Sequence, residues 1–382
     1  MINIDFSSMQ LPPECEAVRR EVREFLRETL EDYTPLQRAH SWMGFDSDFS
    51  QKLGQRGWIG MTWPKQYGGQ ERSFLERYVV LEELLAAGAP VGAHWIADRQ
   101  SGPQLLNYGT ESARQRYLHA ITKGELYFCI GMSEANAGSD LAAIATRGEK
   151  TQGGWIINGA KLWTTIVQDA HVMIALVRTS TAEGNRHSGL SQFLIDLESP
   201  GVTRRAIEDQ AGGRHFGEVF LDDVFVPDDR LLGNEGEGWA QVNAELSLER
   251  SGPERYLSSY QLYHQLVAAV QDSPSELEVD LVGNITAELW TLRQMSLSVA
   301  GKLARGEDAV IEATIVKDLG ACFEQKLPHI VQANFEQSSH STDATALHEV
   351  LSYLLQVSPS FSLRGGTREI LRGIISRGVG LR

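Results

Sequence analysis

The sequence is poor in cysteine and contains no long apolar run. Only three cysteines occur in 382 residues, Cys15, Cys129 and Cys322, and they are far apart with no CxxC pair. An odd number of scattered cysteines does not form a disulfide framework, so we expect buried thiols in a reducing cytosol. No apolar run approaches the roughly 20 residues of a membrane span, and Met1 to Ser8 lacks a basic-then-apolar leader. We therefore expect a cytoplasmic protein without a membrane partner.

Positive charge and metal-binding patterns are also scarce. The formal net charge is −15, which argues against nucleic acid or an anionic membrane as the general partner, although a local basic pocket could still hold a polyanion. The ten histidines show no HExxH or Cys/His spacing, so no metal site is expected. With 42% hydrophobic and 22% charged residues, the composition is that of an ordinary globular protein.

The apolar pattern changes twice along the chain. Between residues 14 and 124 apolar residues recur at helical spacing, as in VRREVREFLRETLE from Val18. Residues 126–226 contain short β-rich runs separated by turns, which favour a small antiparallel barrel or sandwich. After Gly238 the helical spacing returns. We therefore predict an α+β multidomain chain, with a helical domain over 1–124, a β domain over 125–236 and a helical bundle over 237–382.

Two short segments of the β-rich region have the composition of a ligand cradle. SEANAGSD runs from Ser133 to Asp140, and NGAKLWTT from Asn158 to Thr165. Small residues let backbone N–H groups approach an anionic or carbonyl-rich ligand, and Trp163 can flank a planar ring whose edge a threonine hydroxyl can reach. Read separately, the first segment is typical of a turn and the tryptophan of a core. Together they indicate a flavin site.

The order and spacing of these segments resemble the acyl-CoA dehydrogenase family, which carries a TEPGAGSD-like loop followed by an NGxKxWIT-like strand. Further matches cover most of the chain: GWIGMTWPKQYGGQ from Gly57, YGTESARQRYL from Tyr108, FLDDVFVPDDRLLG from Phe220 and GGTREILRGIISR from Gly365. The resemblance implies the same helical, β and four-helix-bundle-like order, and FAD-dependent α,β-dehydrogenation of an acyl-CoA thioester to a trans-2-enoyl-CoA. It also implies FAD contacts at Ile130, Met132, Ser133, Gly138, Ser139, Trp163, Thr164, Thr165, Thr367 and Glu369.

The chain departs from the commonest family pattern at the catalytic base. Removal of the α proton while the β hydrogen leaves as hydride requires a base. Many members use the glutamate of a YEGT-like motif, where this chain reads RGGT with Gly365 in that place, and this substitution alone indicates an inactive chain. A second group of members carries the glutamate on an earlier helix, in an LxxER-like context, with glycine at the C-terminal position. The segment LSLER therefore implies Glu249 as the base and Gly365 as the residue that gives its carboxylate room.

Substrate contacts follow from the same resemblance. They are implied at Ser139, Arg250 and Gly366. The thioester oxygen needs hydrogen-bond donors, and the backbone N–H of Gly365 or Gly366 could serve together with a flavin ribityl hydroxyl. The two glycines are also typical of a turn that opens the final helix.

Two further features have alternative explanations. The break GAPVG, from Gly88 to Gly92, is consistent with a simple helix end or with room for a bulky acyl group. Arg364, Arg368 and Arg372 recur every four residues and would share one helix face. Such a stripe is either solvated, in contact with cofactor phosphates, or in contact with an acidic patch on another chain.

The motifs that a neighbouring subunit supplies to the flavin in homotetrameric members are missing. In place of an RxxFG-like motif the chain reads QDSPSELEVDL from Gln271, and no glycine for a QxxGGxG-like segment occurs between Gly320 and Gly365. Phosphate cradles need close backbone approach. The same departure occurs in members that work as α2β2 heterotetramers, many of them on steroid or other bulky CoA thioesters. The resemblance thus implies a base-bearing subunit, a second acyl-CoA-dehydrogenase-like chain that completes the FAD site, and electron-transfer flavoprotein as the acceptor.

Two other functions are compatible with these residues. A non-catalytic structural subunit would keep the fold as a scaffold for its partner, although it would have no need of Glu249. An acyl-CoA oxidase would keep the flavin but react with oxygen.

Overall fold

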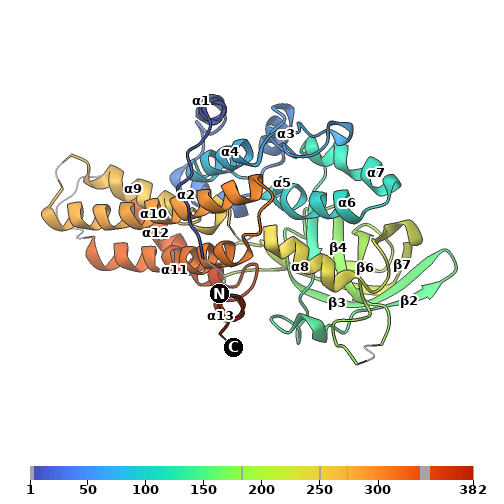
Figure 1. Cartoon of the computed structure of the whole chain (residues 1–382). Helices are drawn as coiled ribbons and strands as arrows, with labels where there is room; N and C mark the ends of the chain where they lie inside the picture. The colour runs from blue at the N-terminus through green and yellow to red at the C-terminus, as the bar shows by residue number, and fades with distance from the viewer. Residues whose placement is uncertain (1–3, 182–183, 249–250, 273, 336–344, 382) are drawn as a thin grey trace. The chain divides into compact units, whose positions relative to one another are not determined.

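The chain folds into two compact units, each built from separate stretches of sequence. The helical unit contains Met1–Gly44, Arg72–Pro90 and Arg250–Arg382, and the sheet unit contains Phe45–Glu71 and Val91–Glu249. The computed structural model describes residues 4–181, 184–248, 251–272, 274–335 and 345–381. Along the chain, helices are followed by strands and then by helices, so the predicted order is confirmed (Figure 1).

The helical unit joins N-terminal helices to a C-terminal bundle. Its N-terminal elements are α1 (Pro13–Thr29), α2 (Pro35–His40), η1 (Ser41–Met43) and α4 (Phe74–Ala86). Its C-terminal elements are η6 (Pro253–Arg255), α9 (Tyr260–Val270), α10 (Glu276–Ala304), α11 (Val310–Asn334), α12 (Thr345–Val357), η7 (Ser358–Ser362) and α13 (Arg368–Gly378). Helix α9 packs against α10 and α12, and α11 also packs against both, which gives the predicted four-helix bundle.

Buried ion pairs connect α1, α4 and α10. Arg293 of α10 donates to both carboxylate oxygens of Glu82, at 2.6 and 3.0 Å, and Arg19 of α1 donates to Glu82 at 3.1 Å. Arg23 contacts Glu83 at 2.7 Å, and Arg19 also reaches Glu83. The two glutamates are 6% and 7% exposed, so each arginine repays part of the cost of removing a carboxylate from water.

The break after α4 is a helix end. Gly88 has φ +71°, and its N–H donates to the Leu85 carbonyl while the N–H of Ala89 donates to that of Leu84. This is the bond pattern that closes a helix with a left-handed residue. A Cβ at Gly88 would lie 2.4 Å from the carbonyl oxygen of Arg38, which accounts for glycine here. Room for an acyl group at this break therefore stays a prediction.

The sheet unit combines short helices with eight strands. The helical elements are α3 (Ser47–Gln55), η2 (Lys65–Tyr67), α5 (Gly92–Ile96), the π-helical turn η3 (Ala97–Ser101), α6 (Gly102–Tyr108), α7 (Glu111–Thr122), η4 (Leu141–Ala143), η5 (Asp228–Arg230) and α8 (Gly238–Leu248). The strands are β1 (Phe128–Gly131), β2 (Arg147–Thr151), β3 (Gly154–Thr165), β4 (Val172–Arg178), β5 (Leu190–Asp196), β6 (Val202–Ile207), β7 (Phe216–Pro227) and β8 (Leu231–Leu232).

The strands form one sheet in the order β6-β7-β3-β2-β4-β5-β8, and β1 pairs with β4. Five of the strand pairs are antiparallel, as predicted, whereas β1 runs parallel to β4 and β2 meets β4 in parallel at a single residue pair. Within the described residues the path of pairing does not return on itself. The predicted barrel or sandwich is therefore an open sheet whose two ends are β6 and β8.

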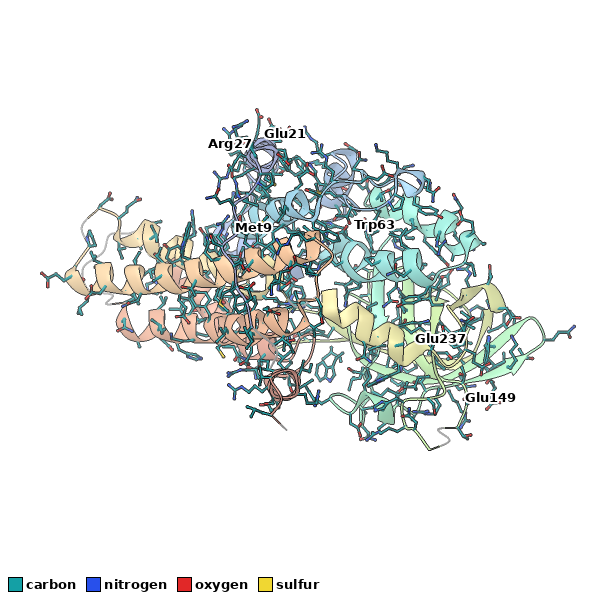
Figure 2. All side chains as sticks on the ribbon, viewed as in Figure 1. Met9, Glu21, Arg27, Trp63, Glu149 and Glu237 are labelled. Carbon is teal, nitrogen blue, oxygen red and sulfur yellow. The ribbon has the colours of Figure 1, made fainter. Side chains whose placement is uncertain are left out.

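Glycines in the sheet unit make room for one buried tryptophan. Trp63, labelled in Figure 2, is 4% exposed. A Cβ at Gly102 would lie 2.1 Å from its ring, and a Cβ at Gly60 would lie 2.7 Å from it. Packing around this side chain thus accounts for Gly60 of the segment that starts at Gly57.

None of the described helices is both long and apolar enough to cross a membrane.

The glycine of α11 gives a test of the packing in the helical unit. A Cβ at Gly320 would lie 2.0 Å from the carbonyl oxygen of Arg255, whereas a Cβ at the exposed Gly283 of α10 would meet nothing within 4 Å. We expect Gly320→Ala to lower the free energy of unfolding by about 1–3 kcal/mol. Gly283→Ala should raise it by up to about 1 kcal/mol, because alanine is the better helix former. Urea titration of both variants measures this difference, and an equally stable Gly320→Ala protein would contradict the contact.

Candidate functional site

The two segments predicted to cradle a flavin meet in the sheet unit. The loop 132–140 follows β1, and its Ser133 carbonyl accepts a hydrogen bond from the N–H of Leu162 on β3 at 2.9 Å. Within the loop, Glu134 and Ala137 exchange two backbone hydrogen bonds of 3.0 and 3.1 Å. Met132 and Ser133 therefore lie beside the C-terminal half of β3.

A buried ion pair fixes this loop to β3. Lys161 is 1% exposed, and its Nζ lies 2.8 Å from Glu134 Oε1 and 3.2 Å from the Met132 carbonyl oxygen. The Glu134 carboxylate also accepts the N–H groups of Ala145 and Thr146, at 2.6 and 3.0 Å. Burial lowers the pKa of Lys161 to about 8, although Glu134 opposes this shift. Burial also opposes ionisation of Glu134, but Lys161 and the two N–H donors hold its pKa below the ordinary value.

A bulge in β3 turns Trp163 outward. The register of β3 against β7 shifts between Lys161 and Thr164, and Trp163 has φ +61°. Lys161 and Thr164 are both buried, at 1% exposed, whereas the Trp163 side chain is 57% exposed and contacts Phe216 edge-on at 6.1 Å between ring centres. A left-handed conformation costs a residue with a Cβ about 1–2 kcal/mol. An exposed indole held at this cost is expected where the ring contacts a ligand.

The remaining predicted flavin residues of the sheet unit differ in how deeply they are buried. Thr165 is half-buried at the end of β3, and Ile130 is half-buried on β1. Gly138 and Ser139 are exposed in the loop, and a Cβ at Gly138 would meet nothing within 4 Å. Thr164 points inward, and its Oγ1 has no hydrogen-bond partner among the described residues.

These residues fit a flavin ring. The exposed Trp163 indole provides a flat apolar face, and the half-buried Ser133 and Thr165 provide hydroxyl groups. The loop backbone is open on the side of Gly138. Among the described residues, no three His, Cys, Asp or Glu side chains gather in a way that could hold a metal ion.

The RGGT turn lies in the helical unit, directly before α13. Gly365 and Gly366 have φ values of +60° and +99°, so both adopt the left-handed conformation that favours glycine. Lys317 of α11 is 1% exposed and donates from Nζ to the Gly366 carbonyl at 2.5 Å. Thr367 precedes the first residue of α13, and backbone and Thr367 hydroxyl hydrogen bonds hold the pKa of Glu369 below its ordinary value. The predicted turn is therefore present and is fixed to α11.

The arginines around this turn have acidic partners in the same chain. Arg368 donates to Asp318 of α11 at 2.8 Å, and Arg372 lies 3.4 Å from the same carboxylate. The Arg364 guanidinium lies 4.3 Å from the ring centre of Trp42 and 3.5 Å from buried Glu324. The prediction of a solvated stripe is wrong for Arg364 and Arg368, because their charges are paired within the helical unit.

The predicted base lies outside the described residues. This applies to Glu249 and also to Arg250, the predicted substrate contact. Gly365, Gly366, Thr367 and Glu369 belong to the helical unit, whereas the other predicted flavin residues belong to the sheet unit.

Sequence reasoning missed three charged residues that organise these segments. Lys161, Glu134 and Lys317 are each at least 90% buried on the side chain. The available signal was the position of Lys161 and Glu134 inside the two cradle segments.

Comparison with known proteins gives matches to two domain models of one family. Residues 12–125 match the acyl-CoA dehydrogenase N-terminal domain and residues 129–224 its middle domain, together more than half of the chain. Acyl-CoA dehydrogenase IpdE1 of Mycobacterium tuberculosis is 34% identical over 62% of this chain, a match that spans 63% of that protein.

Two solved structures share the fold over nearly the full length. The Tcur3481-Tcur3483 steroid ACAD has a TM-score of 0.85 at 25% identity, over 98% of this chain and 100% of that one. The ChsE4-ChsE5 complex from Mycobacterium tuberculosis has a TM-score of 0.83 at 26% identity, again over 98% and 100%.

Two tryptophans of β3 give a matched test of the flavin face. We expect Trp163→Ala to change the free energy of unfolding by less than about 1 kcal/mol, because the side chain is 57% exposed. Trp155→Ala removes a side chain that is 3% exposed and should cost about 3–5 kcal/mol. Trp163→Ala should nevertheless retain less flavin after gel filtration. If it kept the full flavin content, Trp163 would not be a cofactor contact.

Proposed function

Because the chain belongs to the acyl-CoA dehydrogenase family, whose members are FAD flavoproteins, we propose that it dehydrogenates an acyl-CoA thioester as the base-bearing subunit of a heteromeric complex. The product is the trans-2-enoyl-CoA. The observation that carries this proposal is the exposed Trp163 at the β3 bulge, beside a loop that Lys161 and Glu134 hold in place.

The sheet unit would hold the flavin ring. Trp163 would cover one face of the ring, and Ser133, Thr165 and the loop backbone would hydrogen-bond to its edge. When bound, the flavin supplies the acceptor for the hydride that leaves the β carbon, and the two electrons then pass to electron-transfer flavoprotein. Ile130, Met132, Gly138 and Ser139 would complete this surface, whereas the inward-pointing side chain of Thr164 leaves only its backbone for such a contact. Thr367 and Glu369 stay cofactor contacts that the family resemblance implies.

Glu249 would remove the α proton as a carboxylate and become the neutral acid. This assignment rests on the LSLER segment and on Gly365 in place of the usual glutamate. The left-handed conformation of Gly365 supports it, because a glutamate at φ +60° would be strained. The backbone N–H of Gly365 or Gly366 would donate to the thioester oxygen, where negative charge develops as the proton leaves. Ser139 and Arg250 would contact the substrate.

A second chain would complete the adenosine side of the flavin site. Homotetrameric members carry an RxxFG-like motif in this part of the sequence. In this chain, Ser275 and Glu278 instead cap the N-terminus of α10. The Ser275 hydroxyl accepts the Glu278 N–H at 3.3 Å, and the Glu278 carboxylate accepts the Ser275 N–H at 2.8 Å. This capping box uses two backbone N–H groups that would otherwise be free to bind a diphosphate, and it places a carboxylate, which repels one, beside them. Two similar structures, the Tcur3481-Tcur3483 steroid ACAD and the ChsE4-ChsE5 complex, are each named for two proteins.

The acyl group is proposed to be bulky, as in a steroid thioester. Support comes from the similar structure described as a steroid ACAD. Wild-type turnover of a steroid CoA thioester and of butyryl-CoA should favour the steroid, and fast turnover of butyryl-CoA alone would contradict a bulky substrate.

Removal of the proposed base should stop chemistry without loss of cofactor. We expect Glu249→Gln in the flavin-loaded complex to reduce the rate of flavin bleaching by acyl-CoA at least about 1,000-fold, because the amide cannot accept the α proton. Anaerobic stopped-flow absorbance measures the rate.

Glu245→Gln is the matched control, since it makes the same change four residues earlier in the sequence. It should bleach at the wild-type rate. Normal turnover by Glu249→Gln would show that another residue is the base, and full bleaching followed by rapid reoxidation in air would favour an oxidase.

The flavin content should depend on a partner chain. Expressed alone, the protein should carry well under one flavin per chain, because the adenosine side of the site is incomplete. Co-purification with an acyl-CoA-dehydrogenase-like chain encoded beside it should restore the flavin, as measured by absorbance per mole of complex. A full complement in the protein alone would contradict the shared site.

A further inference from the structure

We propose that Lys161 is a positioning residue that raises the electron affinity of the bound flavin by polarising the peptide between Met132 and Ser133. This inference rests on the proposed function, because it concerns the flavin held by the loop 132–140. Lys161 belongs to the NGxKxWIT-like segment, but the family resemblance implied no role for it.

The geometry fixes this peptide from the buried side. The Lys161 ammonium lies 3.2 Å from the Met132 carbonyl oxygen, and Lys161 is 1% exposed. A hydrogen bond from a charged donor is stronger than a neutral one, and low dielectric strengthens it further. In a trans peptide the N–H of Ser133 points away from the Met132 carbonyl. The charge of Lys161 thus makes the Ser133 N–H a stronger donor and directs it away from the protein interior.

Two consecutive residues of β3 hold Ser133 on both sides. Lys161 binds the carbonyl that precedes Ser133, and the N–H of Leu162 binds the Ser133 carbonyl itself at 2.9 Å. Neither peptide plane next to Ser133 can rotate without breaking one of these bonds. The donor is therefore fixed in direction before any ligand binds, so its reorganisation costs little.

Glu134 holds the Lys161 ammonium in place, and the ammonium can still donate to the Met132 carbonyl. Its carboxylate lies 2.8 Å from Lys161 Nζ and is shared with the N–H groups of Ala145 and Thr146. Part of its negative charge is thus compensated by these two N–H groups. The ammonium, by contrast, bridges Glu134 and Met132 directly.

The chemical consequence concerns the reduced cofactor. Reduction increases the negative charge on the ring, so a polarised donor at its edge favours the reduced form over the oxidised form. Without the charge of Lys161 the flavin should be harder to reduce and should bind less tightly. If Lys161 only supported the fold, its replacement in a variant that still folds would leave the flavin reduction potential unchanged. A substitution that keeps the charge would then have no shift to restore.

The test measures the flavin reduction potential of the purified, flavin-loaded complex by reductive titration with a reference dye. We expect Lys161→Met to raise the ratio of oxidised to reduced flavin at a fixed potential about tenfold, which is about 30 mV for a two-electron couple. Lys161→Arg, which keeps the charge, should restore part of the shift. Lys150→Met is the control, since Lys150 lies on β2 of the same unit with its side chain 55% exposed and paired with Asp228. It should keep the wild-type potential.

A second variant keeps the test decisive if Lys161→Met misfolds. Lys161→Met with Glu134→Gln removes both charges, so no buried carboxylate loses its partner, and it should show the same direction of shift. A wild-type potential in either folded variant would overturn the proposal. So would loss of flavin from both together with loss of secondary structure, because Lys161 would then act through folding alone. A wild-type complex without flavin would instead overturn the proposed function, and the inference with it.

Discussion

The bulge between Lys161 and Thr164 is the constraint on which the candidate site depends. In a regular strand, residues three apart point to opposite faces. Here Lys161 and Thr164 are both buried, and the extra residue lets Trp163 face outward between them. A regular β3 would expose either the ammonium or the threonine and would change the direction of the indole. The ion pair with Glu134, the position of the loop and the exposed aromatic face all follow from this one irregularity.

Each of the two units is stabilised internally by a different kind of interaction. The largest apolar cluster of the sheet unit includes the buried side chains of Trp155, Phe193 and Val219, and Lys161 forms a buried ion pair with Glu134 at the site. The helical unit instead places Glu82 and Glu83 between helices and surrounds them with arginines. Replacing one member of such a network leaves a buried charge, which usually costs more than a lost apolar contact.

The order of helices and strands and the nearness of the two cradle segments could be predicted from the sequence, because both depend on local periodicity and on family resemblance. The bulge in β3 could not be predicted, since the segment KLWTT has no residue that demands one. Residue patterns also did not reveal that Arg364 pairs with Glu324, because this contact depends on how η7 and α11 pack. The domain boundaries, and Glu249 as the base, stay predictions.

The ion pairs of the helical unit have a consequence for synthesis of the chain. Glu82 and its partner Arg293 are separated by 211 residues. On the ribosome, α1 and α4 emerge long before α10, and at that stage the carboxylates of α4 lack one of the arginines that later cover them. The whole sheet unit is translated in this interval apart from Phe45–Glu71. The ion-pair network around Glu82 can therefore be completed only after α10 has been synthesised, although Arg19 of α1 is available to Glu82 much earlier.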